Sequence, residues 1–209
     1  MRFNNSVNSK LCAVKLDLAK AYDRVDWSYL ELAMEKLGFH RKWRQWIMEC
    51  VTTVRYRVRF NGVLQNTIQP TRGLHQGDPL SPYLFLFVAD GLSKVLHQET
   101  RTDMIQGLKV CRSTPAVSHL LFADDSLLFF KADERQTRAV KYALSRYCKA
   151  TRQLINFDKC SVLFNKNQAE VVMDAVNSEL NIHRGTFEAK YLGLPTPEGR
   201  MKADKFSPI

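Results

Sequence analysis

The chain has 209 residues, of which 45% are hydrophobic, so it is long and apolar enough to bury one sizeable core, and a disordered protein is excluded. Lysine and arginine total 31 against 21 aspartates and glutamates, and the net charge of +10 suits a partner that carries regular phosphates. No apolar run approaches the roughly 18 residues that span a membrane, and the first residues lack a secretory apolar segment. We therefore expect an intracellular protein of the nucleus or cytoplasm, neither secreted nor membrane-bound.

The first half of the chain is predicted to begin with a buried strand and to continue mainly through helices. The first helix ends at Gly38, and it begins either with Asp26 as its N-cap or with a capping box made by Ser28 and Glu31. The expected elements are a strand at 11–17, helices at 27–37 and 40–52, a hairpin at 54–69 and a helix at 79–98.

The first arm of the hairpin at 54–69 alternates strictly between apolar residues and arginine, over residues 54–60. Arg55, Arg57 and Arg59 therefore share one face of a strand, and the Asn61-Gly62 pair that follows is typical of a hairpin turn. Two interpretations remain open for the arginine face. It is either a solvated strand face or a track for a template or primer backbone, because like charges on one strand repel unless something anionic lies across them.

The second half mixes strands and helices without an internal repeat or a linker rich in proline and glycine. The chain as a whole is therefore expected to be of the α+β class. The elements expected here are paired strands at 107–111 and 117–130, a helix at 133–150, a strand at 160–164, a helix at 167–180 and a short hairpin near 187–195.

Asp124 and Asp125 lie at a turn between two apolar runs, where a hairpin tip would hold their carboxylates rigidly. Two divalent cations about 3.5–4 Å apart can clamp the oxygens of a phosphoryl transfer only if carboxylates offset their repulsion. Mg²⁺ prefers one or two protein carboxylates with water and phosphates, whereas zinc prefers histidine and cysteine. The pair alone also fits an ordinary turn.

Asp17 is a second candidate ligand, at the end of the first strand. A carboxylate between Leu16 and Leu18 is costly unless it is paired or bound to a metal. The alternative is that Asp17 is partly exposed or paired with Lys15 or Lys20. The five cysteines show no Cys-x-x-Cys spacing, which argues against a zinc site and favours reduced thiols without an assigned function.

Three segments carry a family resemblance: Lys-Leu-Asp-Leu-Ala-Lys-Ala-Tyr-Asp-Arg-Val-Asp-Trp (15–27), Arg-Gly-Leu-His-Gln-Gly-Asp-Pro-Leu-Ser-Pro (72–82) and Phe-Ala-Asp-Asp-Ser (122–126). In order and spacing they resemble the reverse transcriptase of non-LTR (LINE-type) retrotransposons, especially the plant type. The resemblance continues through 154–160 and 191–195. It implies the palm of a right-hand polymerase, a split βαβ, ferredoxin-like antiparallel sheet with helices on one face.

The resemblance also implies roles for individual residues. Two Mg²⁺ ions, with Mn²⁺ possible, would be bound by Asp17, Asp124 and Asp125, with Asp17 and Asp124 as the direct ligands of both ions and Asp125 as the third member of the triad. Lys159 would protonate the pyrophosphate leaving group. Tyr22 would lie under the sugar and exclude a ribose 2′-hydroxyl. The loop of Gln76 and Gly77 would touch the incoming nucleotide or the template base, and Tyr191, Leu192 and Gly193 would grip the primer 3′ end.

The leading hypothesis is an RNA-directed DNA polymerase domain that uses an RNA template, a DNA primer and deoxynucleoside triphosphates; no oligomeric state is predicted. Only sixteen residues precede Asp17, so we expect residues 1–209 to form the palm with partial fingers and only the start of the thumb. The alternatives are a catalytically inactive nucleic-acid-binding remnant of a retrotransposon and a residual globular product without a partner.

Overall fold

A four-stranded antiparallel sheet forms the centre of the computed structural model, which describes residues 10–109, 113–165, 168–183, 190–191 and 194–195. The strands lie in the order β4-β5-β1-β6. Their bounds are β1 Leu11–Leu16, β4 His119–Phe122, β5 Asp125–Lys131 and β6 Ser161–Phe164. The central strand β1 thus pairs with two strands that come much later in the chain; Cys12, for example, lies opposite Phe130, 118 positions away.

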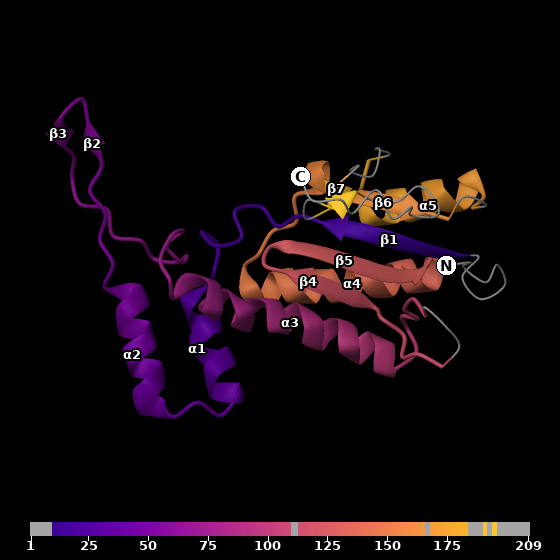
Figure 1. Cartoon of the computed structure of the whole chain (residues 1–209), viewed down its shortest axis with the longest axis horizontal. Coiled ribbons are helices and arrows are strands. Elements are labelled where there is room, and N and C mark those ends of the chain that lie inside the picture. The colour runs from indigo at the N-terminus through magenta and orange to yellow at the C-terminus, as the bar shows by residue number, and fades with distance from the viewer. Residues whose placement is uncertain (1–9, 110–112, 166–167, 184–189, 192–193, 196–209) are drawn as a thin grey trace.

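Two long helices make the connections that this strand order requires (Figure 1). Helix α3 (Ser81–Arg101) lies between β1 and β4 in the chain, and α4 (Glu134–Thr151) joins β5 to β6. The two helices pack against each other, and α5 (Glu170–Leu180) packs beside α4. Two helical crossovers onto one antiparallel sheet make the split βαβ, ferredoxin-like arrangement, which confirms the α+β prediction.

The core lies between one face of the sheet and these helices. Side chains alternate along a strand, so Cys12, Val14 and Leu16 of β1 are buried on the same face as Leu128 and Phe130 of β5. Helix α3 contributes a buried stripe at helical spacing: Leu84, Phe85, Val88, Leu92 and Leu96. The opposite face of the sheet is more open, since Leu120, Phe122 and Leu163 are exposed there.

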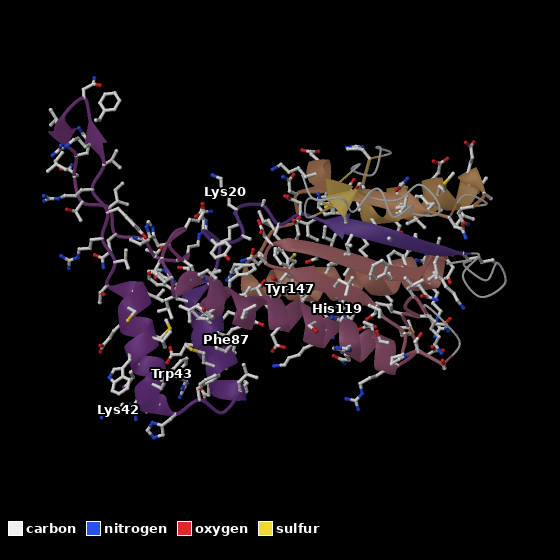
Figure 2. The ribbon with its side chains drawn as sticks, viewed as in Figure 1. Lys20, Lys42, Trp43, Phe87, His119 and Tyr147 are labelled. Atoms are coloured by element: carbon white, nitrogen blue, oxygen red, sulfur yellow. The ribbon has the colours of Figure 1, made fainter. Side chains whose placement is uncertain are left out.

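Helices α1 (Trp27–Lys36) and α2 (Arg41–Thr52) form an antiparallel pair beside α3 (Figure 1). Asp26 accepts a hydrogen bond from the backbone N–H of Tyr29 at 2.9 Å, so Asp26 is the N-cap of α1. The pair is tied to α3 through aromatic rings: Phe39 stacks on Trp43 at 4.5 Å between ring centroids and meets Phe87 edge-on at 5.5 Å (Figure 2).

The hairpin after α2 is shorter than predicted. Its strands β2 (Arg59–Phe60) and β3 (Val63–Leu64) have two residues each, and one isolated bridge joins Tyr56 to Ile68. The apolar side chains at its tip are exposed, with Phe60 66% exposed, so no packing holds a longer ladder in place.

Other differences concern short elements. The strand predicted at 107–111 is reduced, within the described residues 107–109, to a single bridge between Leu108 and Val117, and residues 110–111 lie outside the described part. A 3₁₀ turn at Phe157–Lys159 precedes β6. The hairpin expected near 187–195 is present as β7 (Lys190–Tyr191) and β8 (Leu194–Pro195). In the part of the chain that the structure describes, no helix is both long and apolar enough to cross a bilayer.

Candidate active site

Asp17 and Asp125 come together on the open face of the sheet, at the end where β1 leaves it. The last paired residues of β1 and β5 are Leu16 and Ser126, which are both buried on the helix side. One position further along the antiparallel register, Asp17 follows Leu16 and Asp125 precedes Ser126, and both are half-buried. Because side chains alternate, the two aspartates belong to the opposite, open face of neighbouring strands.

Asp124 lies beside this pair, at the tip of a tight turn. Phe122 pairs with Asp125, which leaves Ala123 and Asp124 as a two-residue hairpin loop. Two-residue loops that match the twist of the strands need a positive φ at the first loop position, and Ala123 has a φ of +52°. A left-handed conformation costs a non-glycine residue about 1–2 kcal/mol. The fold tolerates that cost at the point where the exposed Asp124 is presented.

The far side of Asp17 is covered by the segment that enters β6. The backbone N–H of Asn156 donates to the Asp17 carbonyl at 2.9 Å, and the N–H of Ala19 donates to the Leu154 carbonyl at 2.8 Å. The thiol of Cys160 is buried beside Asp17, and burial, together with the negative charge of Asp17, raises its pKa to about 11. Sequence reasoning gave Cys160 no function, and its place within 154–160 was the only signal for it.

Tyr22 connects the acidic turn to α3. Its ring stacks on Phe85 with centroids 4.8 Å apart and an interplanar angle of 18°. Burial, and secondarily the negative charge of Asp124, raises the pKa of the Tyr22 hydroxyl, so the hydroxyl remains a hydrogen-bond donor at neutral pH. The Tyr22 carbonyl accepts from the N–H of Leu74 at 2.9 Å, which joins this segment to the loop at 72–80.

The loop at 72–80 is pinned at Gly73. Its N–H donates to the Val25 carbonyl at 2.8 Å, and its own carbonyl accepts from Trp27 Nε1 at 2.8 Å. Gly73 has a φ of +93°, and a Cβ there would lie 2.8 Å from the carbonyl oxygen of Asp23. Gly77 has the same φ but nothing within 4 Å of its Cβ position, so the close approach to a ligand expected there stays a prediction.

A buried glutamine after α4 holds the loop between β1 and α1 in place through a hydrogen bond. Gln153 is fully buried, and its Nε2 donates to the carbonyl of Ala21 at 2.9 Å. Arg24 Nε donates to the Arg152 carbonyl at 3.3 Å nearby. No sequence pattern marked Gln153, because a polar residue after a helix ordinarily lies in solvent.

The remaining predicted site residues are exposed or have no described side chain. Lys159 is exposed on the 3₁₀ turn, and Gln76 is exposed on its loop. The three hairpin arginines are exposed, and Arg57 Nε donates to Thr67 Oγ1 at 3.0 Å. Tyr191 lies in β7, whereas Leu192 and Gly193 fall outside the described residues. Lys20 projects from the loop after β1 (Figure 2).

The three aspartates suit a hard divalent cation that is bound partly by carboxylates and partly by substrate phosphates. Among the residues that the structure describes, no three histidine, cysteine, aspartate or glutamate side chains gather closely enough to hold a metal ion by themselves. Mg²⁺ does not need such a cage, because it is usually bound by one or two carboxylates together with water and substrate phosphates. Asp17, Asp125 and the adjacent Asp124 supply carboxylates of this kind and therefore fit the ion.

Curated proteins with similar sequences include retrotransposon polyproteins. It is 31% identical over 150 residues to the retrovirus-related Pol polyprotein of a type-1 R2 element from Popillia japonica, covering 71% of this chain and 23% of that protein. It is 27% identical over 198 residues to the type-2 element R2DM of Drosophila melanogaster, covering 90% of this chain and 18% of that protein. An uncharacterized mitochondrial protein of Arabidopsis thaliana is 44% identical over 66 residues, which are 32% of this chain and 54% of that protein. The chain therefore spans about half or less of these relatives.

Solved structures agree on the fold. A truncated apo telomerase of Candida tropicalis matches with a TM-score of 0.58 at 15% identity, over 77% of this chain and 32% of that chain. A Candida albicans telomerase matches with a TM-score of 0.59 at 17% identity, over 77% and 28%. The α+β polymerase palm is thereby confirmed as the fold. Because the family model of reverse transcriptase (RNA-dependent DNA polymerase) matches residues 2–196, nearly the whole chain, this protein belongs to the reverse transcriptase family, and its R2 relatives place it with the non-LTR retrotransposons.

Proposed function

We propose that this chain is an RNA-directed DNA polymerase domain that adds deoxynucleotides to a DNA primer on an RNA template. It would comprise the palm with part of the fingers and the start of the thumb. The observation that carries the proposal is the β1–β5 register, which brings Asp17 beside Asp125 at the acidic turn, on the open face of a palm sheet. The R2 polyproteins and telomerases that it resembles support the same activity.

The three aspartates would hold the divalent ions, two Mg²⁺ with Mn²⁺ as an alternative. Such ions, when bound, offset the charge of the triphosphate and favour ionisation of the primer 3′-hydroxyl. The carboxylates of Asp17 and Asp125, fixed at the ends of paired strands, would set where the reacting phosphate lies. Asp124 on the turn would complete the set, and the neighbouring protonated Tyr22 hydroxyl would help to hold it in place.

Two further residues would position the incoming nucleotide. The ring of Tyr22, held flat against Phe85, would form the floor under the sugar and leave no room for a 2′-hydroxyl. Gln76, on the exposed part of the pinned loop, would touch the nucleotide or the templating base, with the backbone of Gly77 close by. Deoxynucleoside triphosphates are therefore the proposed substrates.

Other groups would act on the leaving group and on the strands. Lys159 is proposed to protonate the pyrophosphate, since its exposed ammonium lies just after the segment that hydrogen-bonds to Asp17. The hairpin arginines would follow a strand backbone. The hairpin that includes Tyr191, with Leu192 and Gly193 between its strands, would grip the primer end.

The test is primer extension on an RNA template with a DNA primer, deoxynucleotides and Mg²⁺, for the parent chain and Asp124→Asn. The substitution keeps the size of the side chain but removes its charge, so metal-dependent extension should be lost. Asp103→Asn is the matched control, because it removes an exposed carboxylate beyond the far end of α3 and should leave extension unchanged. Undiminished extension by Asp124→Asn would refute the assignment.

A second candidate function is supported by a different observation. Three arginines lie exposed along one hairpin, which suits binding to a nucleic-acid backbone whether or not the acidic turn supports catalysis. A catalytically inactive remnant would retain salt-sensitive binding to primer–template that survives Asp17→Asn and would extend nothing in Mg²⁺ or Mn²⁺. Primer extension and salt-dependent binding to primer–template therefore separate the two candidates.

A further inference from the structure

Lys15 is buried on the open face of the sheet, where a charged side chain would ordinarily reach water. Side chains alternate along β1, so Leu11, Ala13 and Lys15 belong to the open face. Leu11 and Ala13 are half-buried there, whereas Lys15 is only 8% exposed. Burying an ammonium is costly unless opposite charges compensate it. The position of Lys15 therefore calls for carboxylates close by.

The register of the sheet places two carboxylates within reach of Lys15. Asp17 is the next residue on the same face, two positions along the strand and about 7 Å away. Lys15 lies opposite Leu127 of β5, and Asp125 is the next residue on that face, diagonally across from Lys15. Diagonal neighbours on adjacent strands are about 7–8 Å apart, a separation that long side chains bridge. The Lys15 ammonium can therefore lie between Asp17 and Asp125.

Two groups at the start of β6 lie beside the same charges. Burial raises the pKa of the Cys160 thiol to about 11 and a backbone hydrogen bond lowers it; of the two nearby charges, Asp17 raises this pKa and Lys15 lowers it. Both charges are therefore close to one thiol. Ser161 lies opposite Lys15, and its buried hydroxyl makes no hydrogen bond to any residue that the structure describes. This hydroxyl can accept a hydrogen bond from an ammonium.

We propose that Lys15 is a built-in counter-ion of the acidic site. Before an ion binds, its ammonium offsets the mutual repulsion of the Asp17 and Asp125 carboxylates. A divalent ion must displace that charge, so it binds weakly alone and tightly only together with a triphosphate; the hydroxyl of Ser161 is the acceptor to which the ammonium then turns. The inference rests on the proposed function, which makes the aspartates metal ligands. Pairing of Asp17 with Lys15 and ligation of a metal ion are then two successive states of one site.

The first experiment titrates Mn²⁺ alone, without nucleotide or primer, into the full chain and follows the unbound ion by electron paramagnetic resonance. Lys15→Met keeps an unbranched apolar side chain but removes the charge. The repulsion between an ammonium and a divalent ion about 7 Å apart corresponds to about tenfold in affinity even at the dielectric constant of water. Lys15→Met should therefore bind Mn²⁺ at least about tenfold more tightly than the parent chain. Lys15→Gln, a second neutral variant, should show the same gain, and Lys15→Arg should bind like the parent.

Lys131→Met is the matched control for the loss of a positive charge. Lys131 belongs to the same open face, at the other end of β5 from Asp125 and about 20 Å away from it. At about 0.1 M salt the screening length is about 10 Å, so Lys131→Met should leave Mn²⁺ binding unchanged. Adding Asp17→Asn to Lys15→Met should remove the gain in affinity, because the two changes act on one site.

A second measurement gives the same quantity without the resonance signal. Urea unfolding of each chain in EDTA and in Mn²⁺ measures how much the ion stabilises the folded state, and this stabilisation grows with affinity. The rise in the urea midpoint on adding Mn²⁺ should be larger for Lys15→Met than for the parent chain. A cooperative transition in EDTA shows that the variant is folded.

The outcomes separate this inference from the proposed function. Unchanged or weaker Mn²⁺ binding by a folded Lys15→Met would overturn the counter-ion, as would no binding by either chain or a gain that persists after Asp17→Asn. Tighter binding by Lys15→Met, in a protein whose parent chain extends no primer, would support the counter-ion and refute the polymerase activity. Primer extension by the parent chain, with unchanged Mn²⁺ affinity in Lys15→Met, would refute the counter-ion alone.

Discussion

Gly73 and Gly77 form a natural matched pair for measuring how tightly the loop at 72–80 is pinned. Both have a φ of +93°, so alanine at either position adopts a conformation that costs about 1–2 kcal/mol. The positions differ in what the new methyl group meets. At Gly77 it enters open space, whereas at Gly73 it lies 2.8 Å from the Asp23 carbonyl oxygen, which belongs to backbone and cannot rotate away.

The extra cost at Gly73 follows from that contact. To relieve it, the loop must move from the segment before α1 and lose some of the hydrogen bonds with Val25 and Trp27. Overpacking of this kind costs about 1–3 kcal/mol. We therefore expect Gly77→Ala to lower the free energy of unfolding by about 1–2 kcal/mol and Gly73→Ala by about 2–5 kcal/mol.

Urea denaturation followed by circular dichroism measures both values on the full chain, with unchanged m-values as the check that the unfolding transition is the same. The difference between the two variants isolates the close approach, because the conformational cost is common to both. A Gly73→Ala variant no less stable than Gly77→Ala would show that the loop is not held against the chain at Asp23, and the account of the pinned loop would then be wrong.

Three further predictions concern the acidic turn and the hairpin. The pKa of the Cys160 thiol is raised to about 11, so its stabilising contribution is complete below the unfolded pKa of about 8.5 and is lost as the pH rises to 11. Urea unfolding at several pH values measures this loss. Between these two pKa values the free energy of unfolding should fall less steeply with pH in Cys160→Ala than in the parent chain, by up to about 1.4 kcal/mol per pH unit. Ala123→Gly should raise the free energy of unfolding by about 0.5–1 kcal/mol, since glycine relieves the left-handed strain; a lower urea midpoint would contradict this. Replacing Arg55, Arg57 and Arg59 together by alanine should reduce the slope of log affinity against log salt by about 2 for a single-stranded template, and an unchanged slope would place the strand elsewhere.

The features predictable from the sequence were those that depend on local pattern. Strand β1, the helices and the turn at Asp124 follow from periodicity, and Asp26 was one of two predicted ways to begin α1. The predicted length of the hairpin was wrong because alternation predicts a strand whether or not its apolar face packs against anything. The exposed Phe60 shows that this face has no packing partner within the described part of the chain.

The site was less predictable because its contacts join residues far apart in the sequence. The proximity of Asp17 to Asp125 depends on which strands pair, and here the family resemblance supplied what periodicity does not. Three tertiary contacts of the site are not indicated by any local sequence pattern. They are the stacking of Tyr22 on Phe85, the hydrogen bond from Gln153 to Ala21 and the burial of Cys160 beside Asp17.

The strand order β4-β5-β1-β6 has a consequence for how the chain reaches its folded state during synthesis. Strand β1 is made first, yet both of its neighbours are made much later, and the residue opposite Cys12 follows 118 positions behind it. At about 5–20 residues per second, a ribosome leaves β1 without a pairing partner for several seconds or more. The nascent chain should therefore need chaperones most before residue 131 emerges. A truncated messenger RNA that ends earlier would yield a product in which the central strand β1 has no strand to pair with.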